Sequence, residues 1–202
     1  MDYSYEKLAI EKGFKTICGI DEAGRGPLAG PVYAAAVILP IDLEIDGLND
    51  SKKLTEKKRE ALFDVICEKA ISYSIGIATE EEIDEINILN ATFLAMRRAV
   101  DGLSVKPDYA LIDGNQHPGL SIADETVIKG DGKSMSIAAA SILAKVSRDR
   151  FMLQIAEKYP EYCFEKHKGY GTKFHYEMIE KYGVAPIHRR SFLKKILGGS
   201  NG

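Results

Sequence analysis

Residues 17–39 have the sequence ICGIDEAGRGPLAGPVYAAAVIL, and this stretch decides the fold. The apolar run before Asp21 predicts a β-strand over residues 15–20 that ends at Asp21, and the run at residues 32–39 predicts a second strand stopped by Pro40. The glycine- and proline-rich connection of about ten residues is too short for a helical crossover, so we expect the two strands to be antiparallel neighbours.

Outward from these two strands, the chain mixes further strands with helices. Apolar runs predict three more strands, at about residues 71–78, 109–112 and 126–129. Caps and periodicity predict helices over about residues 1–12, 56–69, 134–159 and 192–197, one ending near 182, a short one capped by Thr79 and a longer one capped by Asn90. We expect an α/β fold with a mixed central sheet flanked by helices. Residues 1–202 should form a single domain, with residues 160–202 as a helical C-terminal extension that binds substrate.

The composition is that of an ordinary globular protein. The 202 residues are 45% hydrophobic and 28% charged, with a formal net charge of −3, so the chain is not a globally basic nucleic-acid binder. Basic residues are instead concentrated in residues 165–195, where eight basic and three acidic side chains give a net +5. Such a run is often a solvated helical face, but it also fits a track for phosphates. The eight are Lys166, Lys168, Lys173, Lys181, Arg189, Arg190, Lys194 and Lys195.

The cysteines and the apolar segments indicate a cytoplasmic protein. Cys18, Cys67 and Cys163 are odd in number and have no CxxC spacing, which is typical of reduced thiols. We expect no signal peptide and no transmembrane helix, and therefore no membrane partner.

Three familiar site classes do not fit the sequence. The glycines at residues 24–30 are followed by a strand, whereas a dinucleotide fingerprint requires a helix there. Gly132-Lys133-Ser134 ends like a phosphate-binding loop, but Val127 stands where that motif needs its first glycine. The four histidines are scattered and none pairs with a cysteine at zinc-ligand spacing.

Four carboxylates follow predicted strands. Asp21 and Glu22 follow the first strand, Asp113 follows the fourth, and Asp131 lies between the fifth strand and the long helix. Each alone is an ordinary turn residue, so a site requires all four to meet. Oxygen ligands of this kind select hard cations such as Mg²⁺ or Mn²⁺ over zinc.

Five blocks of sequence in order resemble the ribonuclease HII family. They are DEAGRGPLAGPV at 21–32, DSKKL at 50–54, IDG at 112–114, KGD at 129–131 with SIAAASILAKVSRD at 136–149, and HKGYGT at 167–172. The resemblance implies a ribonuclease H-like fold and a metal-dependent endoribonuclease. Its substrates would be the RNA strand of RNA–DNA hybrids and ribonucleotides embedded in duplex DNA, incised on their 5′ side to leave 3′-hydroxyl and 5′-phosphate ends.

The resemblance also assigns roles to individual residues. Asp21, Glu22, Asp113 and Asp131 would be the catalytic carboxylates and would hold two Mg²⁺ or Mn²⁺ ions. The substrate-binding residues would be Gly24, Arg25, Gly26, Lys52 and Tyr170. The loop at residues 24–26 would read the ribose through its 2′-hydroxyl, Tyr170 would face the sugar on the deoxy side of an RNA–DNA junction, and Lys52 would contact a phosphate. We expect Asp149 to pair with Arg148 or Arg150 rather than to bind metal.

We expect a monomer whose partners are RNA–DNA hybrids and ribonucleotide-containing duplex DNA. Two other functions remain open from the sequence. The first is a non-catalytic hybrid-binding module of the same fold, and the second is a nuclease that acts on DNA alone.

Overall fold

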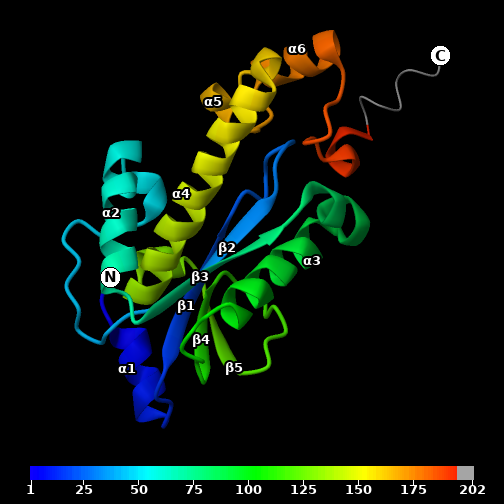
Figure 1. Cartoon of the computed structure of the whole chain (residues 1–202). Coiled ribbons are helices and arrows are strands. Elements are labelled where there is room, and N and C mark those ends of the chain that lie inside the picture. The colour runs from blue at the N-terminus through cyan, green and yellow to red at the C-terminus, as the bar shows by residue number, and fades with distance from the viewer. Residues whose placement is uncertain (195–202) are drawn as a thin grey trace.

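The computed structural model describes residues 1–194, in which a five-stranded sheet is flanked by helices (Figure 1). The strands are β1 (Ile17–Ala23), β2 (Val32–Ile38), β3 (Ser72–Ala78), β4 (Tyr109–Asp113) and β5 (Ala123–Val127), in the spatial order β3-β2-β1-β4-β5. β2 is antiparallel to both β1 and β3, whereas β1, β4 and β5 are parallel. The predicted mixed sheet and the antiparallel first pair are both confirmed.

The helices begin where the sequence places capping side chains. They are α1 (Ser4–Glu11), α2 (Glu56–Lys69), α3 (Glu80–Asp101), α4 (Met135–Lys158), α5 (Phe164–His167) and α6 (Lys173–Tyr182). Thr55, Thr79, Ser134 and Thr172 each accept a hydrogen bond from a backbone N–H in the first turn of the helix that follows, which satisfies one otherwise unpaired donor. Single 3₁₀ turns lie at Ser51–Lys53, Gly130–Gly132, Pro160–Tyr162 and Arg190–Leu193.

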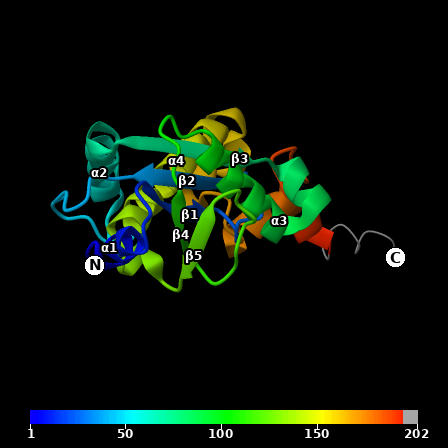
Figure 2. The ribbon, with the colours of Figure 1, turned by 90° about the horizontal axis from the view of Figure 1, so that it is seen from below.

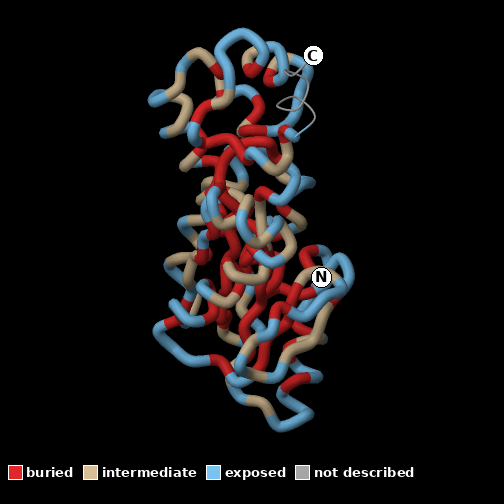
Figure 3. Tube along the Cα trace, turned by 90° about the vertical axis from the view of Figure 1, so that its right-hand side faces the viewer, coloured by how far each residue is buried: buried red, intermediate tan, exposed pale blue. Residues whose placement is uncertain are grey.

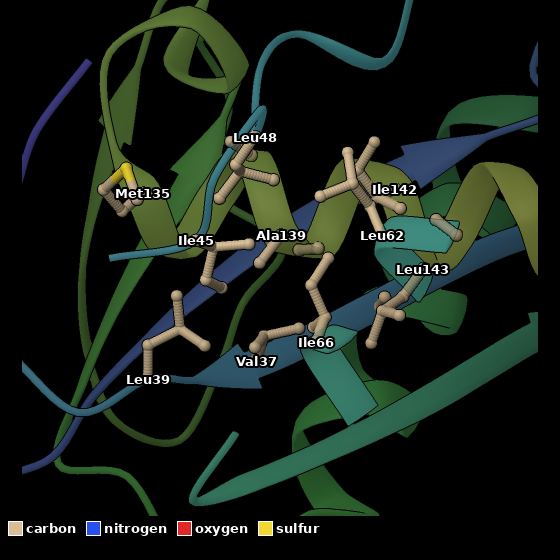
Figure 4. Packing of buried hydrophobic residues seen from close by; sticks show 14 of the residues in the cluster. Val37, Leu39, Ile45, Leu48, Leu62, Ile66, Met135, Ala139, Ile142 and Leu143 are labelled. Atoms are coloured by element: carbon tan, nitrogen blue, oxygen red, sulfur yellow. The ribbon is translucent and has the colours of Figure 1, made fainter. Parts of the chain in front are cut away.

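The two faces of the sheet are covered by different helices. Alternate residues of β2 divide between two apolar clusters: Ala34 and Ala36 join α3, while Ala35 and Val37 join α2 and α4. Figure 4 shows the second cluster, in which Ile66 of α2 lies beside Val37 and Ile142 of α4 contributes further along the helix. The view in Figure 2 shows the strands running between these helices. The sheet core is therefore buried on both faces, as a central β1 requires.

Helix α4 approaches β1 more closely than a side chain would allow. A Cβ atom on Gly19 would lie 2.2 Å from the carbonyl carbon of Ser136, and Ala138, Ala139 and Ala140 are fully buried. Small residues on both elements bring the two backbones together, so the start of α4 is placed firmly against the middle of the sheet.

The C-terminal elements form a separate apolar cluster at the far end of α4. Figure 1 shows α5 and α6 beyond the sheet, and the trace in Figure 3 has buried segments there as well as around the strands. The cluster includes Leu28 and Ala29 from the β1–β2 connection together with Met152 of α4 and Phe164 of α5. This packing ties the connection between the first two strands to the end of the chain.

Several expected boundaries are wrong. β1 continues to Ala23, so Asp21 and Glu22 lie inside the strand, and β5 lies at 123–127 because it pairs with β4 in that register. The break in α3 is at Asn87, whose Oδ1 accepts from the N–H of Leu89 and of Asn90, so Asn87 and not Asn90 caps the second part. Of the last predicted helix only a 3₁₀ turn lies among the described residues, and its end lies outside them. Within residues 1–194 no helix combines the length and the apolar character that crossing a membrane demands.

Candidate active site

Asp21 and Asp113 lie side by side on neighbouring parallel strands. Ile20 of β1 is opposite Ile112 of β4, so each aspartate comes one residue after a paired position. Leu111, two residues before Asp113, packs in one cluster with Ile137 of α4, and the backbone of α4 covers Gly19, two residues before Asp21. Because side chains alternate along a strand, both aspartates belong to the face of the sheet that α4 covers.

Asp131 reaches the same region from the turn that starts α4. It lies in the 3₁₀ turn Gly130–Gly132 and is 5% exposed, and the N–H of Gly130 donates to Asp113 Oδ1 at 2.6 Å. A Cβ atom on Gly130 would come within 2.6 Å of Ile137 Cδ1, so the turn is packed closely on α4. The turn, which lies between β5 and α4 along the chain, is therefore in contact with both the end of β4 and the beginning of α4.

Three of the four carboxylates have raised pKa values, and neighbouring carboxylates contribute to each. Burial raises the pKa of Asp21 well above its usual value, and the charges of Glu22 and Asp113 raise it further. Burial also raises the pKa of Asp113, with Asp131 adding to the effect. The pKa of Glu22 is raised by burial and by Asp113, although the guanidinium of Arg25 acts in the opposite direction. Such mutual repulsion is relieved when a cation binds among the groups.

Neighbouring side chains hold these carboxylates in place. The N–H of Glu22 donates to Asp21 Oδ1 at 2.7 Å, the Ser141 hydroxyl of α4 acts to lower the pKa of Asp21, and the Oγ atoms of Ser141 and Ser51 are 2.8 Å apart in a buried contact. Lys52 Nζ lies 3.3 Å from Asp131 Oδ2, which places the predicted phosphate contact beside the carboxylates with its side chain 78% exposed. Arg25 Nη1 is 3.4 Å from Glu22 Oε1. Both serines lie within the family-like blocks at 50–54 and 136–149, but the sequence assigned them no role, since a hydroxyl carries no signal of what it contacts.

The donor set fits a hard divalent cation in its chemistry. All four predicted ligands offer only carboxylate oxygens, as Mg²⁺ and Mn²⁺ prefer, and at least Asp21 and Asp131 are buried away from competing water. Within residues 1–194, however, no three histidine, cysteine, aspartate or glutamate side chains are already grouped so that they could hold an ion. Lys52 is instead the cation beside Asp131.

The segment Gly24–Gly26 follows β1 directly. Gly24 has φ +99°, and a Cβ atom there would lie 2.2 Å from Arg148 Nε, so both the backbone and the packing require glycine. At Gly26 the nearest atom to such a Cβ is Tyr170 Cε1, at 3.8 Å, which is an ordinary contact. The structure thus brings Tyr170 to this segment from 144 residues further along the chain.

The loop that carries Tyr170 is bonded directly to the β1–β2 connection. The N–H of Leu28 donates to the carbonyl of Gly169 at 2.8 Å, and a Cβ atom on Gly169 would meet the carbonyl oxygen of Ala29 at 2.4 Å. The N–H of Tyr170 donates to His167 O, and His175 Nδ1 donates to Tyr170 O at 2.9 Å. With its backbone held in this way, Tyr170 is 44% exposed and free to contact a ligand.

Two expectations for charged residues are wrong. Arg189, predicted as part of a phosphate track, is 0% exposed and donates to backbone carbonyls of the β1–β2 connection. Asp149 pairs with Lys145 at 2.8 Å rather than with Arg148 or Arg150, and Arg150 pairs with Glu60 of α2. Lys195 lies outside the described residues.

Comparison with known proteins identifies the family. The model of the ribonuclease HII family matches residues 18–195. Ribonuclease HII of Clostridioides difficile (strain 630) is 60% identical over 96% of this chain and 76% of its own length. The crystal structure of ribonuclease H2 from Pyrococcus horikoshii OT3 superposes with a TM-score of 0.73 at 30% identity, covering 88% of this chain and 93% of that one.

A more distant structure shares the fold alone. Bst-RNase HIII, solved in complex with Mn²⁺, gives a TM-score of 0.73 at 19% identity over 92% of this chain and 70% of its own. The ribonuclease H-like fold is therefore confirmed by structures at two levels of sequence similarity. Together with the family match over most of its length, these relationships show that the chain belongs to the ribonuclease HII family.

Proposed function

We propose that the chain cleaves the RNA strand of RNA–DNA hybrids and incises 5′ to single ribonucleotides in duplex DNA, leaving 3′-hydroxyl and 5′-phosphate ends. Membership of the ribonuclease HII family makes it an endoribonuclease of the ribonuclease H type. The choice of substrate and of the cut on the 5′ side is supported by the place of residues 24–26, with Tyr170 beside them, next to the carboxylates. The segment Gly24–Gly26 follows the buried Asp21 and the half-buried Glu22 along the chain, and Tyr170 lies against Gly26.

Asp21, Glu22, Asp113 and Asp131 are the residues that would hold Mg²⁺ or Mn²⁺, with two ions at full occupancy. When bound, the ions would supply activation of the attacking water and stabilisation of the leaving 3′ oxygen. The chain itself contributes the placement of the oxygens: Asp113 by the N–H of Gly130, and Asp21 by the N–H of Glu22. The solved Mn²⁺ complex of the similarly folded Bst-RNase HIII supports the choice of ion.

Recognition of the sugar falls to the two adjoining loops. Gly26 has no side chain to keep a nucleic acid away from the backbone of residues 24–26, so backbone groups can hydrogen-bond a 2′-hydroxyl. Tyr170 is exposed beside Gly26, and its ring would stack on the deoxyribose that follows the ribose. Lys52, exposed beside Asp131, would contact a phosphate at the cut.

The exposed lysines of residues 160–194 would bind the backbone of the duplex further from the cut. Lys166, Lys173 and Lys181 are exposed, whereas Arg189 is not, so the track is shorter than its sequence suggests. We also propose that the protein acts as a monomer in the cytoplasm, where its free Cys18, Cys67 and Cys163 would stay reduced.

The test is a duplex of DNA that contains one ribonucleotide, incubated with Mg²⁺ or with Mn²⁺. The wild-type protein should cut 5′ to the ribonucleotide only when metal is present. Asp113→Asn should lose at least about a hundredfold in rate, because even outer partners of metal ligands cost about 10- to 100-fold. Asp101→Asn, an exposed carboxylate at the end of α3, is the matched control and should cut normally.

Two other outcomes decide between the remaining functions. Metal-independent binding of hybrids without cutting would favour the non-catalytic module, and equal cutting of an all-DNA duplex would favour a deoxyribonuclease. The family match over residues 18–195 speaks against both.

A further inference from the structure

Two buried arginines surround the loops that we propose to read the sugar. Arg189 is 0% exposed and Arg148 is 1% exposed, yet arginine is almost never fully buried without a partner. All hydrogen bonds that their guanidiniums make within residues 1–194 go to backbone carbonyls. Burying a charge costs free energy, and nothing in the sheet itself requires a charged side chain at these two positions.

Arg189 holds the β1–β2 connection through hydrogen bonds to its backbone. Its Nη2 donates to Gly24 O at 2.5 Å, its Nη1 to Arg25 O at 3.0 Å and Pro27 O at 2.9 Å, and its Nε to Gly30 O at 2.8 Å. The planar fork of a guanidinium can satisfy several carbonyls at fixed angles, which a lysine ammonium cannot. The backbone of residues 24–30 is thus wrapped around one side chain.

Arg148 joins this connection to the tyrosine loop. Its Nη2 donates to Ala29 O at 3.0 Å and its Nε to Pro31 O at 3.2 Å, while its Nη1 donates to Lys168 O at 3.0 Å. The ring of Tyr170 lies 5.9 Å from its Cζ atom, within the range of a cation–π contact. One guanidinium therefore contacts both loops at once.

Glu80, the first residue of α3, is a buried carboxylate that acts on both arginines, as Asp149 does on Arg148 and Asp84 on Arg189. It favours the charged form of both arginines and is 9% exposed, and its Oε1 has no hydrogen-bond partner among the described residues. The hydrogen bonds of both guanidiniums therefore go to the loops and not to this carboxylate.

We propose that Arg148 and Arg189 are positioning residues that determine specificity: Arg189 shapes the ribose-reading segment, and Arg148 locks the Tyr170 loop to it. The ribose and the deoxyribose at a junction are then read by one rigid unit. This inference rests on the proposed function, because it assumes that residues 24–26 and Tyr170 contact the sugars. Neither arginine touches the substrate.

The test compares two substrates, a duplex with one ribonucleotide and a uniform RNA–DNA hybrid, in the full chain with Mn²⁺. Arg148→Lys should lower kcat/KM on the single-ribonucleotide duplex about tenfold more than on the hybrid, since misplacement of a loop by about 1 Å can cost about a hundredfold. Arg189→Lys should raise KM on both substrates, because the segment it shapes is needed for each. Arg150→Lys, two residues along α4 and paired with Glu60, is the matched control and should match the wild type on both.

A double substitution separates positioning from a general loss of structure. In a Tyr170→Ala background, Arg148→Lys should change the ratio between the two substrates no further, because its effect acts through Tyr170. An unchanged ratio in the single variant, or an independent further loss in the double variant, would overturn the proposal. If Arg148→Lys does not fold by circular dichroism, Arg148→Gln decides by the same ratio. Failure of the wild type to cut either substrate would instead overturn the proposed function.

Discussion

Gly24 and Gly26 lie two residues apart but are glycines for different reasons. Gly24 has a positive φ and no room for a Cβ atom against Arg148, whereas Gly26 has room and faces Tyr170. Gly24 allows the loop to pack closely on Arg148, and Gly26 leaves the backbone accessible on the side of Tyr170. A sequence motif of the form Gly-Arg-Gly therefore combines a structural position with a binding position.

Substitution separates these two positions. Gly24→Ala should lower the free energy of unfolding by about 2 kcal/mol or more, because it combines backbone strain with overpacking against a buried arginine. Gly26→Ala should leave the unfolding midpoint in urea within the range of a surface substitution but raise KM for the single-ribonucleotide duplex. Equal effects of the two variants on stability would contradict this account.

At the scale of elements, the contact between β1 and α4 brings Asp131 towards Asp21 and Asp113. The backbone of Ser136 and Ile137 lies directly over Gly19, and the turn before α4 carries Asp131. The distance between helix and strand is set by the missing side chain. Metal binding should therefore depend on a residue that offers no ligand.

Gly19→Ala tests this dependence. The new methyl group would sit 2.2 Å from the Ser136 backbone, so α4 must move away from β1 and carry Asp131 with it. We expect a loss of stability of about 1–3 kcal/mol together with weaker Mn²⁺ binding by titration calorimetry. Gly132→Ala, with no atom within 4 Å and no positive φ, is the matched control. Unchanged Mn²⁺ affinity in a folded Gly19→Ala protein would show that the contact does not place the ligand.

The sequence predicted the helices and strands that have strong periodicity or a capping residue. It misplaced the boundaries that depend on contacts with distant residues. The start of α2 was predicted correctly because Thr55 caps it, and the start of α4 was predicted within one residue, at its N-cap Ser134. β5 was misplaced because it is an edge strand of polar residues, recognised only by its pairing with β4. The early break in α3 depends on the left-handed backbone of Asn87, which the later Asn90 concealed.

The candidate site shows the same division. The carboxylates stand out by residue type and by their place after predicted strands, so the sequence alone points to Asp21, Glu22, Asp113 and Asp131. Arg189 and Arg190 are adjacent and identical in type, but tertiary packing buries only the first. Burial of that kind depends on contacts roughly 160 residues apart, which local sequence does not encode.

For the molecule as a whole, a cluster of three buried histidines couples stability to pH. His175 Nδ1 donates to Tyr170 O, so its Nε2 accepts from His188 Nε2 at 3.0 Å. His188 Nδ1 accepts in turn from the N–H of Ala185, and His167 Nδ1 accepts from the N–H of Gly169. Each ring is neutral with one donor and one acceptor, so an added proton would face another donor.

Acid should therefore unfold this end of the molecule first. Burial lowers the pKa of His175 and of His188 to about 4, whereas an unfolded histidine titrates near 6.5. Between these values the unfolded chain holds more protons, so the free energy of unfolding falls as the pH drops, by up to about 1.4 kcal/mol per pH unit for each histidine. Urea unfolding from pH 7 to pH 4 should show this slope. His188→Gln should reduce the slope, and a wild-type curve flat over this range would contradict the buried neutral histidines.

The chemistry of the cut ends tests the central claim most directly. The claim is that buried carboxylates with bound metal direct water to the phosphorus on the 5′ side of a ribose recognised by residues 24–26 and Tyr170. Mass spectrometry of a cleaved single-ribonucleotide duplex should then find a 3′-hydroxyl on the upstream DNA and a 5′-phosphate on the ribonucleotide, with the 2′-hydroxyl intact. A cut 3′ to the ribose that leaves a 2′,3′-cyclic phosphate would mean that the 2′-hydroxyl itself attacks, and would contradict the account.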